Sequence, residues 1–530
     1  MGGWTDHLIV APVLVPLAAS AMILLLKERN QKAKRAIGIA ATFLLIVISV
    51  LLLGNVVAAS LEGEPSTRAY LIGNWPSPFG IILVVDWLSA LMLVLTSILG
   101  FTSLVYALAR WDEAGPRFHA LFLLQLVGLN GAFLTGDLFN LFVFFEVLLA
   151  ASYALLLHGS GATRVKAGLH YVSINVATSL LFLIGAALIY GVAGTLDMAD
   201  LATRIPAIAE SDLALFQAGM AVLGIAFLVK AGMWPLCFWL PTTYGAASAP
   251  VAASFAILTK IGVYAVLRMG LLLFGDEAGA SAGFGREWLV IGGLVTLGFG
   301  MIGVLASQEL SRLAAFSLLV SSGTLLAAIG VGDAAVTGAA LYYLVASTLG
   351  VSAFFLLIEL VERGRKPGAD MLAVTAEAFG EIDDEAASEE EVGIAIPATM
   401  ALLGLSFVCC AMLVAGLPPL PGFIAKFALL SALLEPNPIK PTAWVMLVLL
   451  MLSGLAAIVA MGRAGVRIFW GSQEGRPPRV RVIEMTPIVL LLAMSAMLTL
   501  QAGPAMRYLQ DAADALHHPR GYIDGVLGSR

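Results

Sequence analysis

The sequence has 530 residues, of which 60% are hydrophobic and only 12% are charged, and its formal net charge is −6. A soluble protein of this length could not bury so much apolar surface, so the composition excludes a globular soluble fold and predicts a polytopic membrane protein. The net charge is a weak indicator, because many acids lie together in "EIDDEAASEEE" at 381–391, which we expect to be a solvated or disordered linker.

About fourteen apolar runs are long enough to cross a bilayer. Only helices or closed barrels satisfy backbone polar groups in lipid, and these runs are too long and too uniformly apolar for barrel strands. The first run is not expected to be a cleaved signal peptide, because its basic cluster follows it rather than precedes it. The sequence therefore predicts an all-α polytopic membrane protein with crossings near 8–26, 36–58, 79–108, 118–135, 138–157, 167–190, 213–243, 249–272, 288–306, 313–331, 336–360, 395–434, 442–462 and 485–502.

Basic residues indicate how the crossings are oriented. The segment "KERNQKAKR" at 27–35 has five positive charges, and the segment 463–481 has five arginines. The other basic residues on the same side of this threading are Arg110, Arg117, Arg164, Lys166, Arg363, Arg365 and Lys366. The opposite loops carry few. Because basic loops stay in the cytoplasm, both termini are predicted to face the outside.

One apolar segment, residues 394–434, is too long for a straight crossing. Its only charge is Lys426, and as a continuous helix it would span about 60 Å, twice the hydrocarbon core. This segment and the run at 442–462 lie between two basic loops, 363–366 and 463–481, which must both be cytoplasmic. The chain between these loops must therefore cross the membrane an even number of times. Residues 394–434 are therefore predicted to be one broken crossing, with its break at "GLPPLPG", 416–422.

A second segment, residues 213–243, has the same character. It carries Lys230 and is interrupted by "MWP" at 233–235 and by Pro241. In this segment Lys230 precedes the prolines, whereas in 394–434 Lys426 follows the prolines. The two segments cross the membrane in opposite directions. This mirrored order is what an inverted repeat predicts, with broken helices in matching positions of the two halves.

Four ionisable residues are predicted to lie at membrane depth: Glu146, Lys230, Lys260 and Lys426. Glu146 lies about 13 Å along its helix, close to the bilayer midplane, and Lys260 lies about 16 Å into its own run. A charge at the bilayer centre costs at least ~2.5 kcal/mol. These groups should therefore pair with one another, face water, or exchange protons.

Three roles are open for the four groups. They could be structural ion pairs that hold helices together. Long side chains could snorkel, although this suits helix ends rather than Glu146 or Lys260. They could also form a proton relay, because burial favours neutral lysine and a nearby carboxylate favours charged lysine, so that a lysine whose partner moves can bind and release a proton. We favour the relay.

Other polar residues are weaker candidates for an accessory path. Asp86 in "VVDWLSALM" could equally be a helix-packing group, and Asp137 could cap a helix. His158 and His170 flank the inner loop 158–168 and could admit protons, although histidines at membrane interfaces are commonly just solvated. The hydroxyls of Ser321, Ser322, Ser347 and Thr348 could hold water between two of the lysines, or could bond helix to helix.

Three long stretches resemble a known family. They are "GDLFNLFVFFEVLLAASYALLLHG" at 136–159, "LVKAGMWPLCFWLPTTYGAASAPVAA" at 228–253 and "LPPLPGFIAKF" at 417–427. They closely resemble the D subunit of Mrp-type cation/proton antiporters (multisubunit Na+/H+ or K+/H+ antiporters), a family similar to the antiporter-like subunits of respiratory complex I. The resemblance extends over most of the chain.

The resemblance implies a core of two inverted five-helix repeats, each with one broken helix. It divides the chain into 1–116, with the first three crossings; 117–272, the first repeat; 273–462, the second repeat, with an acidic cytoplasmic loop at 362–393; and 463–530, with the last crossing and an outer tail.

The resemblance also implies roles for the buried charges. Glu146 and Lys230 would be the charge pair of the first half, Lys260 the central relay, and Lys426 the terminal lysine of the second half. Many relatives have a histidine in the helix that matches "LYYLVASTLG" at 341–350, but this run has none. Water held there by Ser347 or Thr348 would have to bridge Lys260 and Lys426.

The leading hypothesis is a secondary transporter subunit rather than an enzyme. It would move protons inward and Na+ or K+ outward across a bacterial inner membrane, and it would work only with other membrane subunits of a hetero-oligomeric antiporter complex. The alternative is a proton-pumping subunit of a complex I-like or membrane hydrogenase redox complex; a passive scaffold is a third class. The cation cannot be chosen between Na+ and K+ from these residues.

No cofactor, metal or nucleic-acid partner is expected. The three cysteines, Cys237, Cys409 and Cys410, all lie in apolar runs, where packing is the better interpretation than a disulfide or a metal site. No nucleotide-binding loop or haem-ligand cluster is present in the sequence.

Overall fold

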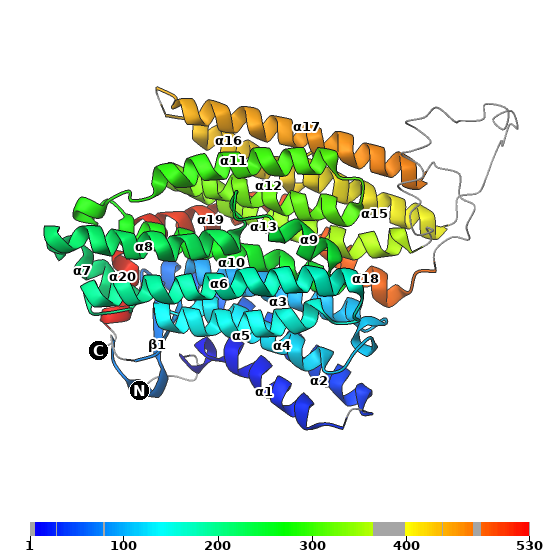
Figure 1. Cartoon of the computed structure of the whole chain (residues 1–530), viewed down its shortest axis with the longest axis horizontal. Helices are drawn as coiled ribbons and strands as arrows, with labels where there is room; N and C mark the ends of the chain where they lie inside the picture. The colour runs from blue at the N-terminus through cyan, green and yellow to red at the C-terminus, as the bar shows by residue number, and fades with distance from the viewer. Residues whose placement is uncertain are drawn as a thin grey trace, which may run out of the picture.

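The computed structural model describes residues 6–27, 29–77, 80–363, 398–436, 438–469 and 479–528. In these ranges long helices run side by side along the longest axis of the molecule (Figure 1). Twelve are long and apolar enough to span a membrane, and α1 (Ala11–Leu25), α4 (Phe118–Leu134) and α16 (Pro421–Leu434) are shorter apolar helices. Counting α16 as half of a broken crossing, the described helices confirm the predicted fourteen. The predicted acidic linker at 381–391 lies outside the described residues.

The first three crossings are α1, α2 (Gln31–Leu61) and α3 (Trp87–Ala107). The prediction that the third crossing begins near residue 79 is wrong. Residues Ile82–Val85 instead form strand β2, which pairs antiparallel with β1 (Arg68–Leu71). Their sequence, "ILVV", is as apolar as a helix in lipid, but β-branched residues also suit a strand. Asp86 then caps α3, accepting a hydrogen bond from Ser89 N at 2.9 Å.

The remaining helices form two sets of five crossings and a C-terminal part. The first set is α4, α5 (Leu138–Leu156), α6 (Ala162–Ala193), the broken pair α8 (Glu210–Ala231) and α9 (Trp239–Ala246), and α10 (Ala249–Phe274), with the short α7 (Met198–Arg204) after α6. The second set is α11 (Arg286–Ala306), α12 (Leu310–Val331), α13 (Ala334–Glu362), the broken pair α15 (Ala398–Ala415) and α16, and α17 (Pro441–Phe469). After these come α18 (Val482–Leu500), α19 (Ala502–His517) and α20 (Arg520–Leu527).

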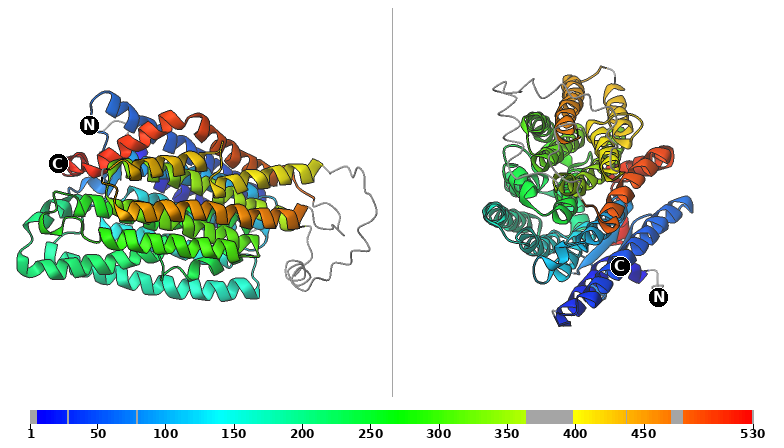
Figure 2. Two further views of the ribbon diagram at one scale, coloured as in Figure 1. Left: turned by 90° about the horizontal axis from the view of Figure 1, so that it is seen from above. Right: turned by 90° about the vertical axis from the view of Figure 1, so that its right-hand side faces the viewer.

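Burial places α10 and α13 at the centre of the bundle. Nearly every residue of both helices is buried, whereas α2, α6 and α17 are buried along one face only. The α1–α2 pair lies at one edge of the bundle and α17 at the opposite edge (Figure 2). The two sets of five therefore meet at α10 and α13, the most fully buried of the membrane-spanning helices that the structure describes.

The two broken crossings have the same local structure. Each first half ends at a glycine in the left-handed region (Gly232, φ 75°; Gly416, φ 76°), which side chains rarely adopt. The next residue donates its N–H to the carbonyl five residues earlier, the bond that closes a Schellman cap: Met233 to Leu228 at 3.0 Å, and Leu417 to Met412 at 2.9 Å. A proline follows within two residues, and the second half continues onward, as Figure 1 shows. The predicted broken crossings are confirmed.

The predicted outer tail, residues 503–530, is folded along its described part. Helices α19 and α20 are amphipathic and bury Leu509, Leu516 and Tyr522 against the bundle. Tyr508 Oη donates to the carbonyl of Trp87 at 2.7 Å, which ties α19 to the start of α3. Both helices lie toward the end of the molecule that carries the two chain termini (Figure 1).

The basic loops that are predicted to be cytoplasmic meet at the opposite end. Arg110 and Arg363 both form ion pairs with Glu359, and Arg363 also pairs with Glu484 at the start of α18, at 2.7 Å. In the adjoining loop, burial lowers the pKa of His158, whose Nε2 is 2.7 Å from the carbonyl of Trp111. Of the residues that the positive-inside rule placed together, the structure thus brings Arg110 and Arg363 to one side.

We expect this end to be cytoplasmic. In a variant without the three native cysteines, Asp511→Cys on the exposed face of α19 should react with a membrane-impermeant maleimide added from outside. Lys166→Cys, exposed near the start of α6, should react only after the membrane is permeabilised. The reverse pattern of labelling would contradict the orientation.

Candidate functional site

Helix α6 connects the two charges of the first repeat, of which Lys230 is buried and Glu146 is partly exposed. Glu146 on α5 accepts a short hydrogen bond from Ser179 Oγ, and Lys230 Nζ on α8 donates to Asn175 Oδ1 at 3.2 Å. Asn175 and Ser179 are four residues apart on α6, so they lie on one face, one turn from each other. Lys230 is 7% exposed, and its Nζ lies 5.3 Å from the centre of the Phe145 ring.

Glu146 and Lys230 do not touch directly. Among the residues that the structure describes, no ion pair within 4.0 Å joins them. The charge pair that the family resemblance implies is therefore an indirect arrangement, in which a hydroxyl and an amide of α6 stand between a carboxylate and an ammonium group. Such neutral groups can reorient when either charge gains or loses a proton.

Lys260 is the central charge and is completely buried, with 0% exposure. Its Nζ donates to Ser321 Oγ on α12 at 2.6 Å. Ser321 Oγ is in turn 2.9 Å from Ser347 Oγ on α13. These three side chains make a continuous hydrogen-bonded chain from the first repeat into the second.

A small cavity continues the chain toward the second break. It has about 30 Å³ of room for water, which is enough for on the order of two molecules. Ser347 and Tyr343 line it on the α13 side, and Gly422 and Ser453 line it beside α16 and α17. The cavity thus lies where the missing histidine led us to expect bridging water.

Lys426 closes the path at the break itself. Its Nζ donates to the carbonyl of Ala415 at 2.8 Å. Ala415 ends α15, so this carbonyl is one of those that a helix terminus leaves without a helical partner. A Cβ on Gly416 would lie 3.1 Å from this Nζ, and one on Gly454 would lie 3.4 Å from it. Two glycines therefore make the space in which the Lys426 side chain turns back to the break.

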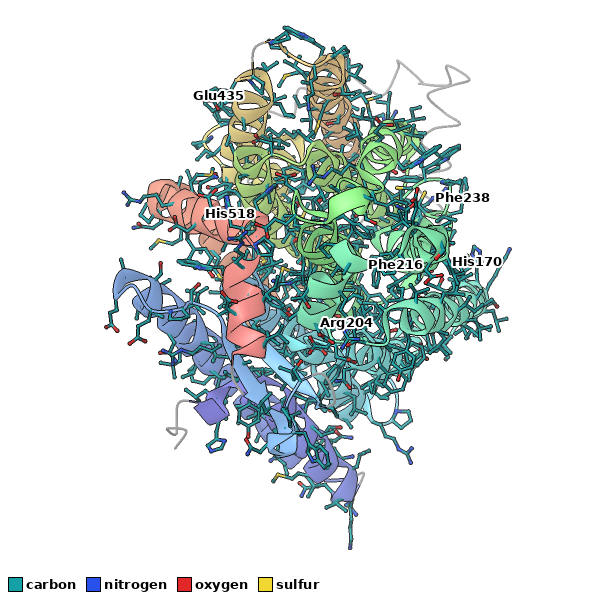
Figure 3. The ribbon with its side chains drawn as sticks, turned by 90° about the vertical axis from the view of Figure 1, so that its left-hand side faces the viewer. His170, Arg204, Phe216, Phe238, Glu435 and His518 are labelled. Atoms are coloured by element: carbon teal, nitrogen blue, oxygen red, sulfur yellow. The ribbon has the colours of Figure 1, made fainter. Side chains whose placement is uncertain are left out.

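The accessory candidates are only partly brought to this path. Ser347 lies on it, but the Thr348 hydroxyl donates to its own helix, to Leu344 O at 2.6 Å. Asp137 caps α5 as expected, accepting from Asn140 N at 2.8 Å. His158 is buried in the loop after α5, whereas His170 is exposed on α6 (Figure 3).

Asp86 proves to be half of a buried ion pair. Its partner is Arg268 on α10, whose guanidinium donates to both carboxylate oxygens. The sequence analysis considered buried lysines and overlooked Arg268, although it lies in the same apolar run as Lys260. It also overlooked Asn175 and Ser179, whose spacing of four in an apolar helix was the available signal.

Helix α10 is held against α8 by a glycine contact. A Cβ on Gly262 would lie 2.4 Å from the backbone nitrogen of Ala231, the residue after Lys230. Gly262 itself is two residues from Lys260. This close approach of two backbones sets the distance between the helices that carry the first and the central lysine.

The match with known proteins agrees with this geometry. The family model described as NADH:quinone oxidoreductase/Mrp antiporter, TM, matches residues 135–455, which include all four charges of the path. The D subunit of a probable K+/H+ antiporter from Rhizobium meliloti is 58% identical over 535 aligned positions, covering 100% of this chain and 99% of the relative. The chain belongs to the NADH:quinone oxidoreductase/Mrp antiporter transmembrane family. Within that family, it is similar along its whole length to the D subunits of cation/proton antiporters.

Two further relatives extend the likeness. The D subunit of the Na+/H+ antiporter from Alkalihalophilus pseudofirmus is 31% identical, with 98% of this chain and 99% of the relative covered. A chain in the solved structure of the Mrp complex from Dietzia superposes with a TM-score of 0.80 at 26% identity, over 99% of this chain and 100% of that chain. The fold of that chain is therefore shared along the whole length, and the neighbour is part of an Mrp complex.

The Gly262 contact generates a stability prediction. Gly262→Ala should force α8 and α10 apart and destabilise the protein by about 1–3 kcal/mol, the usual cost of overpacking. Gly270→Ala is the matched control, because it lies in the same helix and its Cβ would meet nothing within 4 Å. Thermal unfolding of the purified complex should show a lower midpoint only for Gly262→Ala. Equal midpoints for the two variants would contradict the contact.

Proposed function

We propose that the chain is the proton-translocating subunit of a multisubunit monovalent cation/proton antiporter in a bacterial inner membrane. The observation that supports this most strongly is the chain of hydrogen bonds from Lys260 through Ser321 to Ser347 and the cavity. It leads from the central charge to the break beside Lys426. Structural ion pairs would not require such a chain of hydrogen bonds. Among the described residues, moreover, no acid contacts Lys260 or Lys426.

The chemistry of the path assigns a role to each group. Protonated lysine only donates, whereas neutral lysine has a lone pair that can bind a proton, so Lys260 can pass a proton to the hydroxyl that it touches and later take one up again. A serine hydroxyl both donates and accepts, so Ser321 and Ser347 can relay a proton without holding a charge. Ser347 also has a second acceptor, Leu344 O at 3.2 Å, to which its proton can turn. Lys426 would receive the proton through water in the cavity.

Glu146 and Lys230 would provide the entry to this path. When Glu146 is charged, its attraction keeps Lys230 protonated; when Glu146 gains a proton, Lys230 is left more ready to release one toward Lys260. The close contact at Gly262 packs α10, the helix that carries Lys260, against the backbone of Lys230. We propose the first repeat as the half that loads the central lysine and the second repeat as the half that discharges it.

The exchanged ion is proposed from the relatives' names. The 58% identical relative is named for K+/H+ exchange and the 31% identical one for Na+/H+ exchange, so K+ is the first cation to test and Na+ the comparison. The partners would be the other membrane subunits of the complex. A redox-linked pump would use the same relay, but it would show no cation-dependent proton flux without an electron donor.

Glu146→Gln tests the proposed function. In proteoliposomes that contain the assembled complex, K+- or Na+-dependent proton flux should fall by about tenfold or more, since each ~1.4 kcal/mol added to a barrier slows a step tenfold. Glu210→Gln, at an exposed glutamate in the first turn of α8, should leave flux unchanged. Normal flux in an assembled Glu146→Gln complex would remove the relay, and failure to assemble would favour a structural ion-pair role.

Ser347→Ala tests the hydroxyl bridge. Removing this hydroxyl breaks the chain between Ser321 and the cavity, so the proton flux should fall while the cation affinity stays unchanged. Thr348→Val is the matched control, because it removes a hydroxyl from the next residue that bonds only to its own helix. Equal flux in the two variants, at equal amounts of assembled complex, would exclude Ser347 from the path.

A further inference from the structure

Two aspartates face each other at the end of the first repeat that is predicted to be outer. Asp137 and Asp197 are opposed in an isolated antiparallel bridge. The residues after them, Leu138 and Met198, donate their N–H groups across the bridge at 2.9 and 2.8 Å. Because these bonds flank the aspartates and do not join them, the two residues form the closer kind of cross-strand pair, with Cα atoms about 4.5 Å apart and side chains on one side. Like charges in this position repel.

Each aspartate uses one carboxylate oxygen to cap a helix. Asp137 Oδ1 accepts from Asn140 N, and Asp197 Oδ1 accepts from Asp200 N, both at 2.8 Å. The second oxygen of Asp197 is buried without a hydrogen-bond partner in the described part of the chain, and Asp197 is only 1% exposed. A buried carboxylate oxygen left without a partner is costly, so its persistence requires an explanation.

A third oxygen stands beside this pair. Ser77 is 6% exposed, and its Oγ also lacks a hydrogen-bond partner in the described part of the chain. Burial raises the pKa of Asp197, and the nearby Ser77 hydroxyl partly offsets this rise, so the two side chains are close although they are not in hydrogen-bonding geometry. Burial, with a smaller contribution from the charge of Asp197, raises the pKa of Asp137 to about 6.

No cation of the described chain neutralises the pair. On α7, Arg204 is paired with Asp200 at 2.8 Å, and on α10, Arg268 is paired with Asp86. From α20, Tyr522 approaches Asp197 and stacks against Arg268, with 5.0 Å between ring centre and guanidinium. The arginines on these neighbouring elements are therefore engaged elsewhere. Figure 3 looks onto this end of the bundle, where the label of Arg204 marks α7.

We propose that Asp137, Asp197 and Ser77 form an outer binding site for one monovalent metal cation. Carboxylate and hydroxyl oxygens are hard ligands suited to such ions. One bound cation would relieve the repulsion and satisfy the free oxygens. The choice of a monovalent ion rests on the proposed antiport function. The site begins α5 about 13 Å before Glu146, so it stands where ions would exchange between the outside and the path.

Because a carboxylate must lose its proton to bind a metal ion, proton release provides a test that does not depend on transport. Adding KCl or NaCl to the weakly buffered, detergent-purified complex near pH 6 should release protons, whereas choline chloride at equal concentration should not. Asp197→Asn should abolish this release and still cap α7, since Asn is as good an N-cap as Asp. Asp333→Asn is the matched control: Asp333 caps α13 through Val336 N at 3.0 Å, and its ionisable neighbour is His517 rather than an acid.

A second variant and a transport measurement complete the test. Ser77→Ala removes one ligand without changing charge or cap and should raise the concentration of K+ or Na+ that gives half-maximal proton release by about tenfold, equivalent to ~1.4 kcal/mol. In proteoliposomes, Asp197→Asn should raise the apparent KM for the cation on the outer side. The Asp333→Asn complex should behave like the wild type in both measurements.

The outcomes separate this site from the proposed function. Proton release that is equal in the wild type and in Asp197→Asn, or that choline chloride also produces, would overturn the site. Release by CaCl2 alone would overturn the assignment to a monovalent ion. A wild-type complex that releases protons on cation binding but shows no antiport would keep the site and overturn the proposed transport function.

Discussion

The need to satisfy the backbone at a break in a membrane helix governs much of this structure. Ending α15 at Ala415 leaves carbonyl oxygens without helical donors, and lipid offers none. Lys426 supplies one donor by turning back to Ala415 O. In the first repeat, Trp239 Nε1 donates to Val229 O at 3.3 Å near the end of α8. In this way the breaks hold polar groups at membrane depth that a continuous helix would exclude.

The two breaks share a cap but differ in where their lysine lies. Both first halves end in a left-handed glycine followed by the same five-residue backbone bond. Lys230 lies before the glycine in the first break, and Lys426 lies after it in the second. Because the repeats are inverted, Lys230 lies on the half-helix before its break and Lys426 on the half-helix after its break. Both lysines are still next to a bend.

Hydroxyl groups, not a titratable side chain, stand next to Lys260 on the side of the second repeat. Ser321 and Ser347 connect Lys260 to a cavity without adding a charge to the core. A neutral bridge avoids the cost of desolvating another ion, but it can move protons only by reorienting its hydrogen bonds. The arrangement also leaves Lys260 without an acidic partner among the described residues, so its charge must be offset by the hydroxyl, by water, or by releasing the proton.

The sequence alone determined the class of fold, the number of crossings, both breaks and the four central charges. Hydropathy, the positions of basic loops and the positions of prolines can all be read from local composition. The thickness and apolar character of the bilayer then restrict where helices can cross and where they must break. The prediction from sequence failed where apolar character does not distinguish a helix from a strand, as in the "ILVV" strand before α3. Partner choice also needed the tertiary structure. Only the packing of α10 on α3 shows that Asp86 belongs to Arg268, and only the bridge between distant loops sets Asp137 against Asp197. The physical reason is that composition sets how deep a charge lies, whereas the residue it meets depends on which helices pack together.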